Sequence, residues 1–232
     1  MRALAAGVAL VLVAVPFALL LFLVQDKWRP LARADAGARD DLHSYAVGHG
    51  PFVTAMNTLS TLGSAPVYIA VFAVVVGWLL WRRLPRLALF VVVTVAGSSL
   101  LNQVVKVAVD RSRPVLPDPV AHANGMSFPS GHAQSAVVAY SVLLLVFLPV
   151  LRGTWRPTAV AVAVLMVLGI GFSRVALGVH YVSDVLAGYV LGGAWVLAMA
   201  AAFNAWRVER GKPKASLDEG LEPEAAPRLD AR

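Results

Sequence analysis

Residues 128–151 read FPSGHAQSAVVAYSVLLLVFLPVL, in which a proline, a serine, a glycine and a histidine precede a stretch without any charged residue, 133–151. Such a stretch approaches the roughly 20 residues that a helix needs to cross a bilayer core of about 30 Å. A buried helix in a large soluble protein would have a similar sequence. The remainder of the chain decides between these two interpretations.

Five other stretches also lack Asp, Glu, Lys and Arg: 3–24, 65–81, 87–105, 158–173 and 185–206. Only 14% of the 232 residues are charged, whereas an average soluble domain has about 25%. Too little polar chain remains to cover a soluble core built from six buried helices. We therefore predict an all-α integral membrane protein, in which residues 1–206 form a bundle of six transmembrane helices and 207–232 a disordered cytoplasmic tail. The first stretch is longer than the apolar core of a signal peptide, about 7–15 residues, so we expect an uncleaved span.

The basic residues predict the orientation of this bundle. The formal net charge is +7, and with alternating spans most basic loops fall on one side, which the positive-inside rule makes cytoplasmic. These loops contain Arg2; Arg82, Arg83 and Arg86; Arg152 and Arg156; and Arg207, Arg210, Lys212 and Lys214. We expect a plasma-membrane protein with both termini in the cytoplasm and no nucleic-acid partner. The long outer loop 25–63 is predicted to contain a short interfacial helix near Leu42–Val47.

Three cations gather at the outer ends of the predicted spans. Lys106 ends the span 87–105, Arg113 follows it, and Arg174 ends the span 158–173. Charges at membrane depth cost about 2.5–3.5 kcal/mol each, which makes them candidates for function. Arginine matches the geometry of phosphoryl oxygens, although anchoring to lipid headgroups is the simpler alternative. Asp110 and Arg111, in the same region, are expected to form a loop ion pair.

The PSGH segment predicts a helix start that can bind an anion. Ser130 is a suitable N-cap, and the free N–H groups of a first helical turn attract negative charge. Gly131 would let an anion approach the backbone closely, with His132 beside it. An ordinary cap next to an incidental histidine fits these residues equally well.

His180 and Asp184 are four residues apart, which on a helix places them on one face. A carboxylate–imidazole hydrogen bond would fix the tautomer and leave the second ring nitrogen as a nucleophile or base. A structural polar pair is the alternative. Together with the cations and the helix start, the pair predicts a phosphoryl-transfer site without any cluster of metal ligands.

These residues carry a family resemblance. The segments KVAVDRSRP (106–114), PSGH (129–132) and SRVALGVHYVSD (173–184) resemble the three motifs of the type 2 phosphatidic acid phosphatase (PAP2) family, KxxxxxxRP, PSGH and SRxxxxxHxxxD. Vanadium-dependent haloperoxidases are similar in these motifs, but they are largely soluble proteins. The resemblance implies a PAP2/haloperoxidase-like helical bundle.

The resemblance also implies a role for each residue of the motifs. His180 would attack phosphorus and form a phosphohistidine, Asp184 would hold its ring, and His132 would protonate the leaving oxygen and later activate water. The phosphoryl oxygens would be held by Lys106, Arg113, Ser130, Gly131 and Arg174. The three cations would replace a metal, so the resemblance implies that neither a metal nor another cofactor is needed.

The implied substrate is a membrane lipid phosphate or diphosphate, taken at the outer membrane face. Undecaprenyl diphosphate is favoured, with phosphatidylglycerophosphate and phosphatidic acid as relatives of the same chemistry. Two alternatives stay open: a lipid-dependent phosphotransferase, and a headgroup binder or flippase without enzymatic activity.

Overall fold

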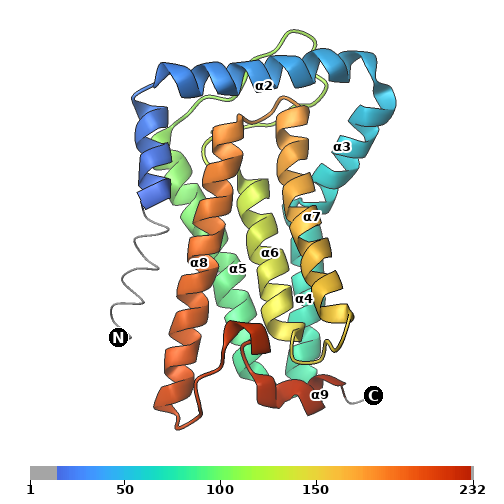
Figure 1. The fold of residues 1–232 in the computed structure, drawn as a ribbon, viewed down its shortest axis with the longest axis vertical. Helices are drawn as coiled ribbons and strands as arrows, with labels where there is room; N and C mark the ends of the chain where they lie inside the picture. Colours follow the sequence, from blue (N-terminus) through green and yellow to red (C-terminus); the bar gives the residue numbers. More distant parts are fainter. Residues whose placement is uncertain (1–14, 231–232) are drawn as a thin grey trace.

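The computed structural model describes residues 15–230, and every regular element in that range is helical. A short helix, Val15–Gln25, leads into α2 (Arg29–Gly48), which lies across one end of a bundle of upright helices (Figure 1). The bundle is formed by α4 (Ala65–Trp81), α5 (Pro85–Val109), α6 (Gly131–Phe147), α7 (Trp155–Ala176) and α8 (Val182–Glu209), with α3 (Gly50–Leu62) leaning against it. Below, the end covered by α2 is called the α2 end, and the opposite end is called the tail end.

The apolar stretches from residue 65 onward form helices where they were predicted. Three described helices, α5, α7 and α8, are long and apolar enough to cross a membrane, and α3 with α4 adds a fourth if this pair, bent by 42°, is one span. The helix Val15–Gln25 and α6 are apolar but shorter. Most of the expected first span, 3–24, lies outside the described residues. Helix length alone therefore does not establish six spans.

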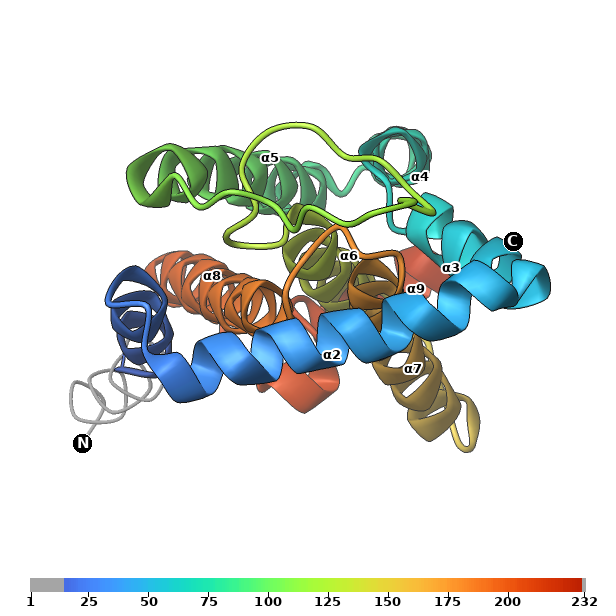
Figure 2. The ribbon, with the colours of Figure 1, turned by 90° about the horizontal axis from the view of Figure 1, so that it is seen from above.

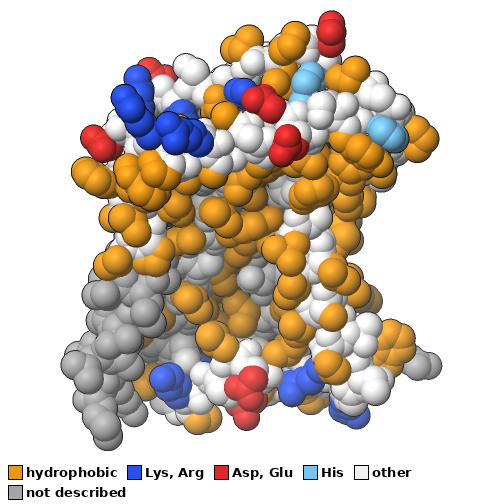
Figure 3. Space-filling model, turned by 45° about the horizontal axis from the view of Figure 1, so that its top comes forward, with side chains coloured by type: hydrophobic (Ala, Val, Ile, Leu, Met, Phe, Trp, Pro, Cys, Tyr) orange, Lys and Arg blue, Asp and Glu red, His pale blue; other side chains and the backbone are white. Residues whose placement is uncertain are grey.

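The outer surface of the bundle is suited to lipid. Large apolar side chains on its helices are exposed, among them Ile69 on α4 at 69%, Val74 at 72% and Leu165 on α7 at 68%. The visible face in Figure 3 has a hydrophobic belt between charged groups at the two ends. This pattern is typical of a protein whose middle faces hydrocarbon and whose ends face water.

The segment 25–63 is more helical than expected. The predicted short helix near Leu42–Val47 is instead the 20-residue α2, with Pro30 in its first turn, and α3 follows after His49. Pro at the start of a helix and several alanines favour this conformation. Figure 2 shows α2 passing over the ends of α8 and α7, so α2 covers this part of the bundle.

Helix α6 is the centre of the bundle and packs against α5, α7 and α8. It begins below the ends of α7 and α8, so its N-terminus lies inside the protein (Figure 1). Two glycines of α8 bring the helices together. A Cβ atom on Gly188 would lie 2.7 Å from the carbonyl oxygen of Ser130, and one on Gly192 would lie 2.9 Å from that of Gln134.

The tail differs from the predicted disordered segment. Residues up to 230 fold back against the tail end through η1 (Leu217–Glu219), η2 (Pro223–Ala225) and α9 (Ala226–Asp230), with Leu221 and Leu229 buried in the main apolar cluster. Its acidic residues meet cations of the bundle, since Glu222 lies 3.1 Å from Arg86 Nη1 and Glu224 lies 2.6 Å from Arg207 Nη1. These partners supply the stabilisation that the tail sequence lacks by itself.

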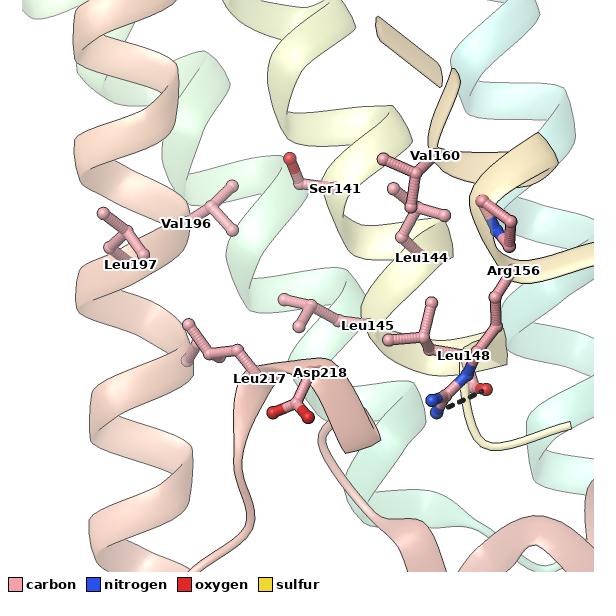
Figure 4. A pocket seen from close by; sticks show the side chains of 12 residues that line it. Ser141, Leu144, Leu145, Leu148, Arg156, Val160, Val196, Leu197, Leu217 and Asp218 are labelled. Atoms are coloured by element: carbon pink, nitrogen blue, oxygen red, sulfur yellow. Dashed lines mark hydrogen bonds between the residues drawn. The ribbon is translucent and has the colours of Figure 1, made fainter. Parts of the chain in front are cut away.

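A cavity of about 500 Å³ lies between this tail and helices α6, α7 and α8. Figure 4 shows its leucine and valine side chains, with Arg156 and Asp218 among them. Among the described residues that line this cavity there is no histidine, and Arg156 is the only cation. Its chemistry therefore does not match the phosphoryl-transfer set predicted from the sequence.

The close contact of α8 with α6 generates a prediction. Gly188→Ala should lower the unfolding temperature in detergent, because the added methyl group meets backbone atoms that cannot move aside cheaply; overpacking of this kind costs about 1–3 kcal/mol. Gly193→Ala is the matched control, since a Cβ there meets nothing within 4 Å. Equal unfolding temperatures for the two variants would contradict this account of the packing.

Candidate active site

A second cavity, of about 580 Å³, lies at the α2 end, among α5, α6, α7 and the loop that follows α5. It is lined by six of the residues predicted from the sequence: Lys106, Arg113, Gly131, His132, Arg174 and His180. The other two, Ser130 and Asp184, lie directly behind the lining and are fully buried. The structure thus brings all eight residues to one place.

The expected helix start at Ser130 is confirmed. Its Oγ accepts a hydrogen bond of 3.4 Å from the N–H of Ala133, and α6 begins at Gly131. The N–H of Ser130 donates to the backbone carbonyl of Asp184 over 2.9 Å, which ties the start of α6 to the start of α8. A Cβ on Gly131 would lie 3.3 Å from the side-chain oxygen of Asn102, so the backbone here is held close to α5.

His180 lies in the connection between α7 and α8, with 1% of its surface exposed. Its Nδ1 is 3.3 Å from Asp184 Oδ2, and its Nε2 is 3.0 Å from Arg113 Nη1. A guanidinium can only donate, so Nε2 is the acceptor and Nδ1 carries the proton. Burial lowers the pKa of His180 to about 4, although the bond to Asp184 opposes this shift. The ring is therefore neutral at neutral pH.

The geometry of this pair differs from the expected shared helix face. His180 precedes α8, and Asp184 is the third residue of that helix, where its carboxylate reaches back. Oδ2 of Asp184 accepts from the backbone N–H of Tyr181 over 2.9 Å, as a carboxylate does in a capping box. The histidine is close because the chain folds back at the cap.

Two further groups bind Asp184 that the sequence interpretation missed. Ser127 Oγ donates to Oδ2, and Arg111 Nη1 donates to Oδ1 over 2.6 Å. Arg111 was expected to pair with Asp110, but its described partners are Asp184, Ser183 and Asp35. Asp35 lies 76 residues before Arg111, and no local pattern signals such a pairing.

The three predicted cations contact neutral oxygen atoms. Lys106 Nζ donates to the carbonyl of Met126 over 2.6 Å, Arg113 Nη1 to that of Val179 over 2.8 Å, and Arg174 to Ser60 Oγ. Among the ion pairs of residues 15–230, none involves Lys106, Arg113 or Arg174. Their charge is therefore available to an anion in the cavity. Within the same range, no group of three or more His, Asp or Glu side chains is arranged to hold a metal ion.

Comparisons with known proteins agree with this geometry. The family model of the PAP2 superfamily matches residues 87–207, which include all eight predicted site residues. A phosphatidylglycerophosphatase B from Bacillus subtilis is 33% identical over 140 residues, covering 59% of this chain and 68% of that protein. A lipid A 1-phosphatase from Rhizobium etli is 32% identical over 119 residues, and the match spans about half of each chain, 47%.

The fold also has a solved counterpart. The crystal structure of a transmembrane PAP2-type phosphatidylglycerolphosphate phosphatase from Bacillus subtilis superimposes with a TM-score of 0.73 and 25% identity. The match covers 83% of this chain and 94% of that one. With the family model matching just over half of its residues and a relative matched over more than two thirds of its length, the chain belongs to the PAP2 superfamily.

Proposed function

We propose that this membrane lipid phosphatase hydrolyses its substrate in two steps, through a phosphate carried on Nε2 of His180. The observation that supports this most directly is the imidazole itself. It is neutral, its Nδ1 faces a buried carboxylate, and its Nε2 lone pair lies in the wall of a cavity that contains three cations. An oriented nucleophile beside charges that stabilise a phosphoryl group is the arrangement that covalent phosphoryl transfer requires.

In the first step, Nε2 attacks phosphorus and the bond from phosphorus to the lipid oxygen breaks. The electron pair leaves on that oxygen, which takes a proton from His132. For this, His132 must enter the step as an imidazolium, a form that the charge of the bound phosphate stabilises. The ring of His180 becomes positively charged, and Asp184 stabilises this charge through Nδ1. In the second step, His132 takes a proton from water, the resulting hydroxide attacks phosphorus, and the P–N bond breaks. Phosphate leaves, and His180 is neutral again.

The phosphoryl oxygens would be held by Lys106, Arg113, Arg174 and the first turn of α6. Nε of Arg174 is buried and has no hydrogen-bond partner among the described residues, so it is available as a donor. Arg113 would exchange its contact with His180 for an equatorial oxygen when substrate binds, which frees the lone pair for attack. The N-terminus of α6 adds the N–H group of Gly131, where a first helical turn favours an anion; the N–H of Ser130 donates to the carbonyl of Asp184 instead.

We propose the outer membrane face as the site of the reaction, because the basic loops Arg82–Arg86 and Arg152–Arg156 lie at the opposite end. The relatives act, by their names, on phosphatidylglycerophosphate and lipid A. For this chain we propose lipid phosphates and diphosphates, with undecaprenyl diphosphate the first to test and phosphatidylglycerophosphate and phosphatidic acid beside it. Purified protein given each lipid in turn should release inorganic phosphate; appearance of the phosphate on an acceptor instead would indicate a phosphotransferase.

The phosphohistidine generates a direct prediction. After mixing with a lipid radiolabelled in its phosphate and rapid quenching, the protein should carry label that is stable in base and lost in acid. His180→Gln should abolish the label and reduce turnover about 10³-fold or more, as loss of a covalent nucleophile does elsewhere. His49→Gln is the control, because His49 is exposed between α2 and α3 and does not line the cavity. Label that persists in His180→Gln would contradict the mechanism.

Arg174→Lys tests whether the planar guanidinium matters. An ammonium keeps the charge but cannot contact Ser60 and a phosphoryl oxygen with separate nitrogens, so kcat/KM should fall about 10–100-fold, the value of one charged hydrogen bond. Arg156→Lys, at the other end of the same helix, should retain wild-type kcat/KM. Full activity of Arg174→Lys would show that charge alone is sufficient.

Metal dependence is tested by chelation. Turnover should be unchanged by EDTA, because three side-chain cations supply the positive charge that magnesium supplies in many phosphoryl-transfer enzymes. Activity that disappears with EDTA and returns with a divalent cation would contradict this expectation.

A further inference from the structure

A chain of charged groups, buried except for part of Arg111, connects the catalytic pair to helix α2. Arg111, in the loop after α5, donates through Nη1 to Asp184 Oδ1 over 2.6 Å and through Nη2 to Asp35 Oδ2 over 2.9 Å. Asp35 lies on α2 and is 1% exposed, and Asp184 is fully buried. Neither Asp35 nor Arg111 lines the cavity of the candidate active site. We propose that Asp35 and Arg111 are positioning residues that set the charge and orientation of Asp184.

Asp35 also binds the first turn of α8. Its Oδ1 accepts from the backbone N–H of Ser183 over 2.9 Å, and its Oδ2 accepts from Ser183 Oγ over 2.5 Å. The first N–H groups of a helix have no partner within it, and a carboxylate is favourable there. Asp35 is thus a cap supplied by a different helix, and it joins α2 to the turn that contains His180 and Asp184.

Arg111 is held on its other face as well. Its guanidinium carbon lies 4.1 Å from the centre of the Tyr181 ring, a cation–π contact with the residue that follows His180. The guanidinium also donates to Ser183 Oγ over 2.7 Å. A planar group with this many directional contacts has one orientation, which fixes Oδ1 of Asp184. Oδ2 is left to accept from Ser127, Tyr181 and His180.

The charges explain why two acids are needed. Asp35 and Arg111 neutralise each other, so the negative charge of Asp184 remains for the ring of His180. Without Asp35, the positive charge of Arg111 would be compensated by Asp184, which would then stabilise a charged imidazole less. Without Arg111, the two buried carboxylates would have no cation between them and would repel each other. Loss of either partner should therefore harm catalysis, and loss of both should harm it less than loss of Asp35 alone.

This inference rests on the proposed function of His180, and a double-mutant cycle tests it. Asp35→Asn keeps an oxygen for Ser183 but removes the charge, and we expect kcat to fall about 10–100-fold with KM nearly unchanged, as for other groups that orient a catalytic side chain. Arg111→Gln should lower kcat by a similar factor. The double variant Asp35→Asn/Arg111→Gln should recover a kcat above that of Asp35→Asn.

The controls separate charge balance from simple loss of structure. Asp40→Asn removes an exposed carboxylate of α2 that pairs with Arg39, and it should leave kcat unchanged. Thermal unfolding in detergent verifies that each variant is folded. A double variant with kcat at or below that of Asp35→Asn would overturn the proposal, because a purely structural tie predicts that outcome.

If the proposed function itself is wrong, a different experimental result is expected. If wild-type protein releases phosphate but never carries acid-labile label, the phosphohistidine is wrong. The cycle would still report whether Asp35 and Arg111 act on Asp184, since it is measured in kcat for phosphate release.

Discussion

The buried carboxylate of Asp184 is the group on which the rest of this structure depends. A fully buried carboxylate is costly unless its oxygens accept hydrogen bonds. Here the donors come from separate parts of the chain: Ser127 and Arg111 from the loop after α5, and Tyr181 from the turn before α8. The hydrogen bonds that Asp184 accepts thus hold the long polar loop after α5 against the start of α8. Folding of the loop and orientation of His180 are consequences of the same requirement.

The sequence predicted the bundle helices well because the bilayer sets their length and composition. The stretch 65–81 coincides with α4, and the four later stretches fall within or close to α5, α6, α7 and α8. Of α2 the sequence predicted only a short interfacial helix near Leu42–Val47, since a longer helix with charges of both signs resembles a loop. It also did not predict the folded tail, whose partners Arg86 and Arg207 lie in other segments. Contacts of this kind leave no periodic pattern.

In the site, as in the fold, the sequence predicted residues that lie in short motifs and missed contacts between residues far apart in the chain. The eight predicted site residues come from three short motifs, and the structure brings them together at one cavity. Ser127 and Asp35 were missed, and Arg111 was given the wrong partner. Ser127 is hydrogen-bonded to Asp184 across 57 positions of the chain. Arg111 is hydrogen-bonded to Asp35 across 76 positions and to Asp184 across 73. A pair of charged residues adjacent in sequence, such as Asp110 and Arg111, says little about which charges meet in space.

The position of the α6 N-terminus has a consequence for how a lipid reaches the cavity. Helix α6 begins below the ends of α7 and α8, so a phosphate bound at its N-terminus, as we propose, would lie inside the bundle. A chain lifted out of its leaflet would lose about 0.8 kcal/mol per methylene. Entry in the plane of the leaflet avoids that loss, and the dephosphorylated product remains in the membrane without crossing water.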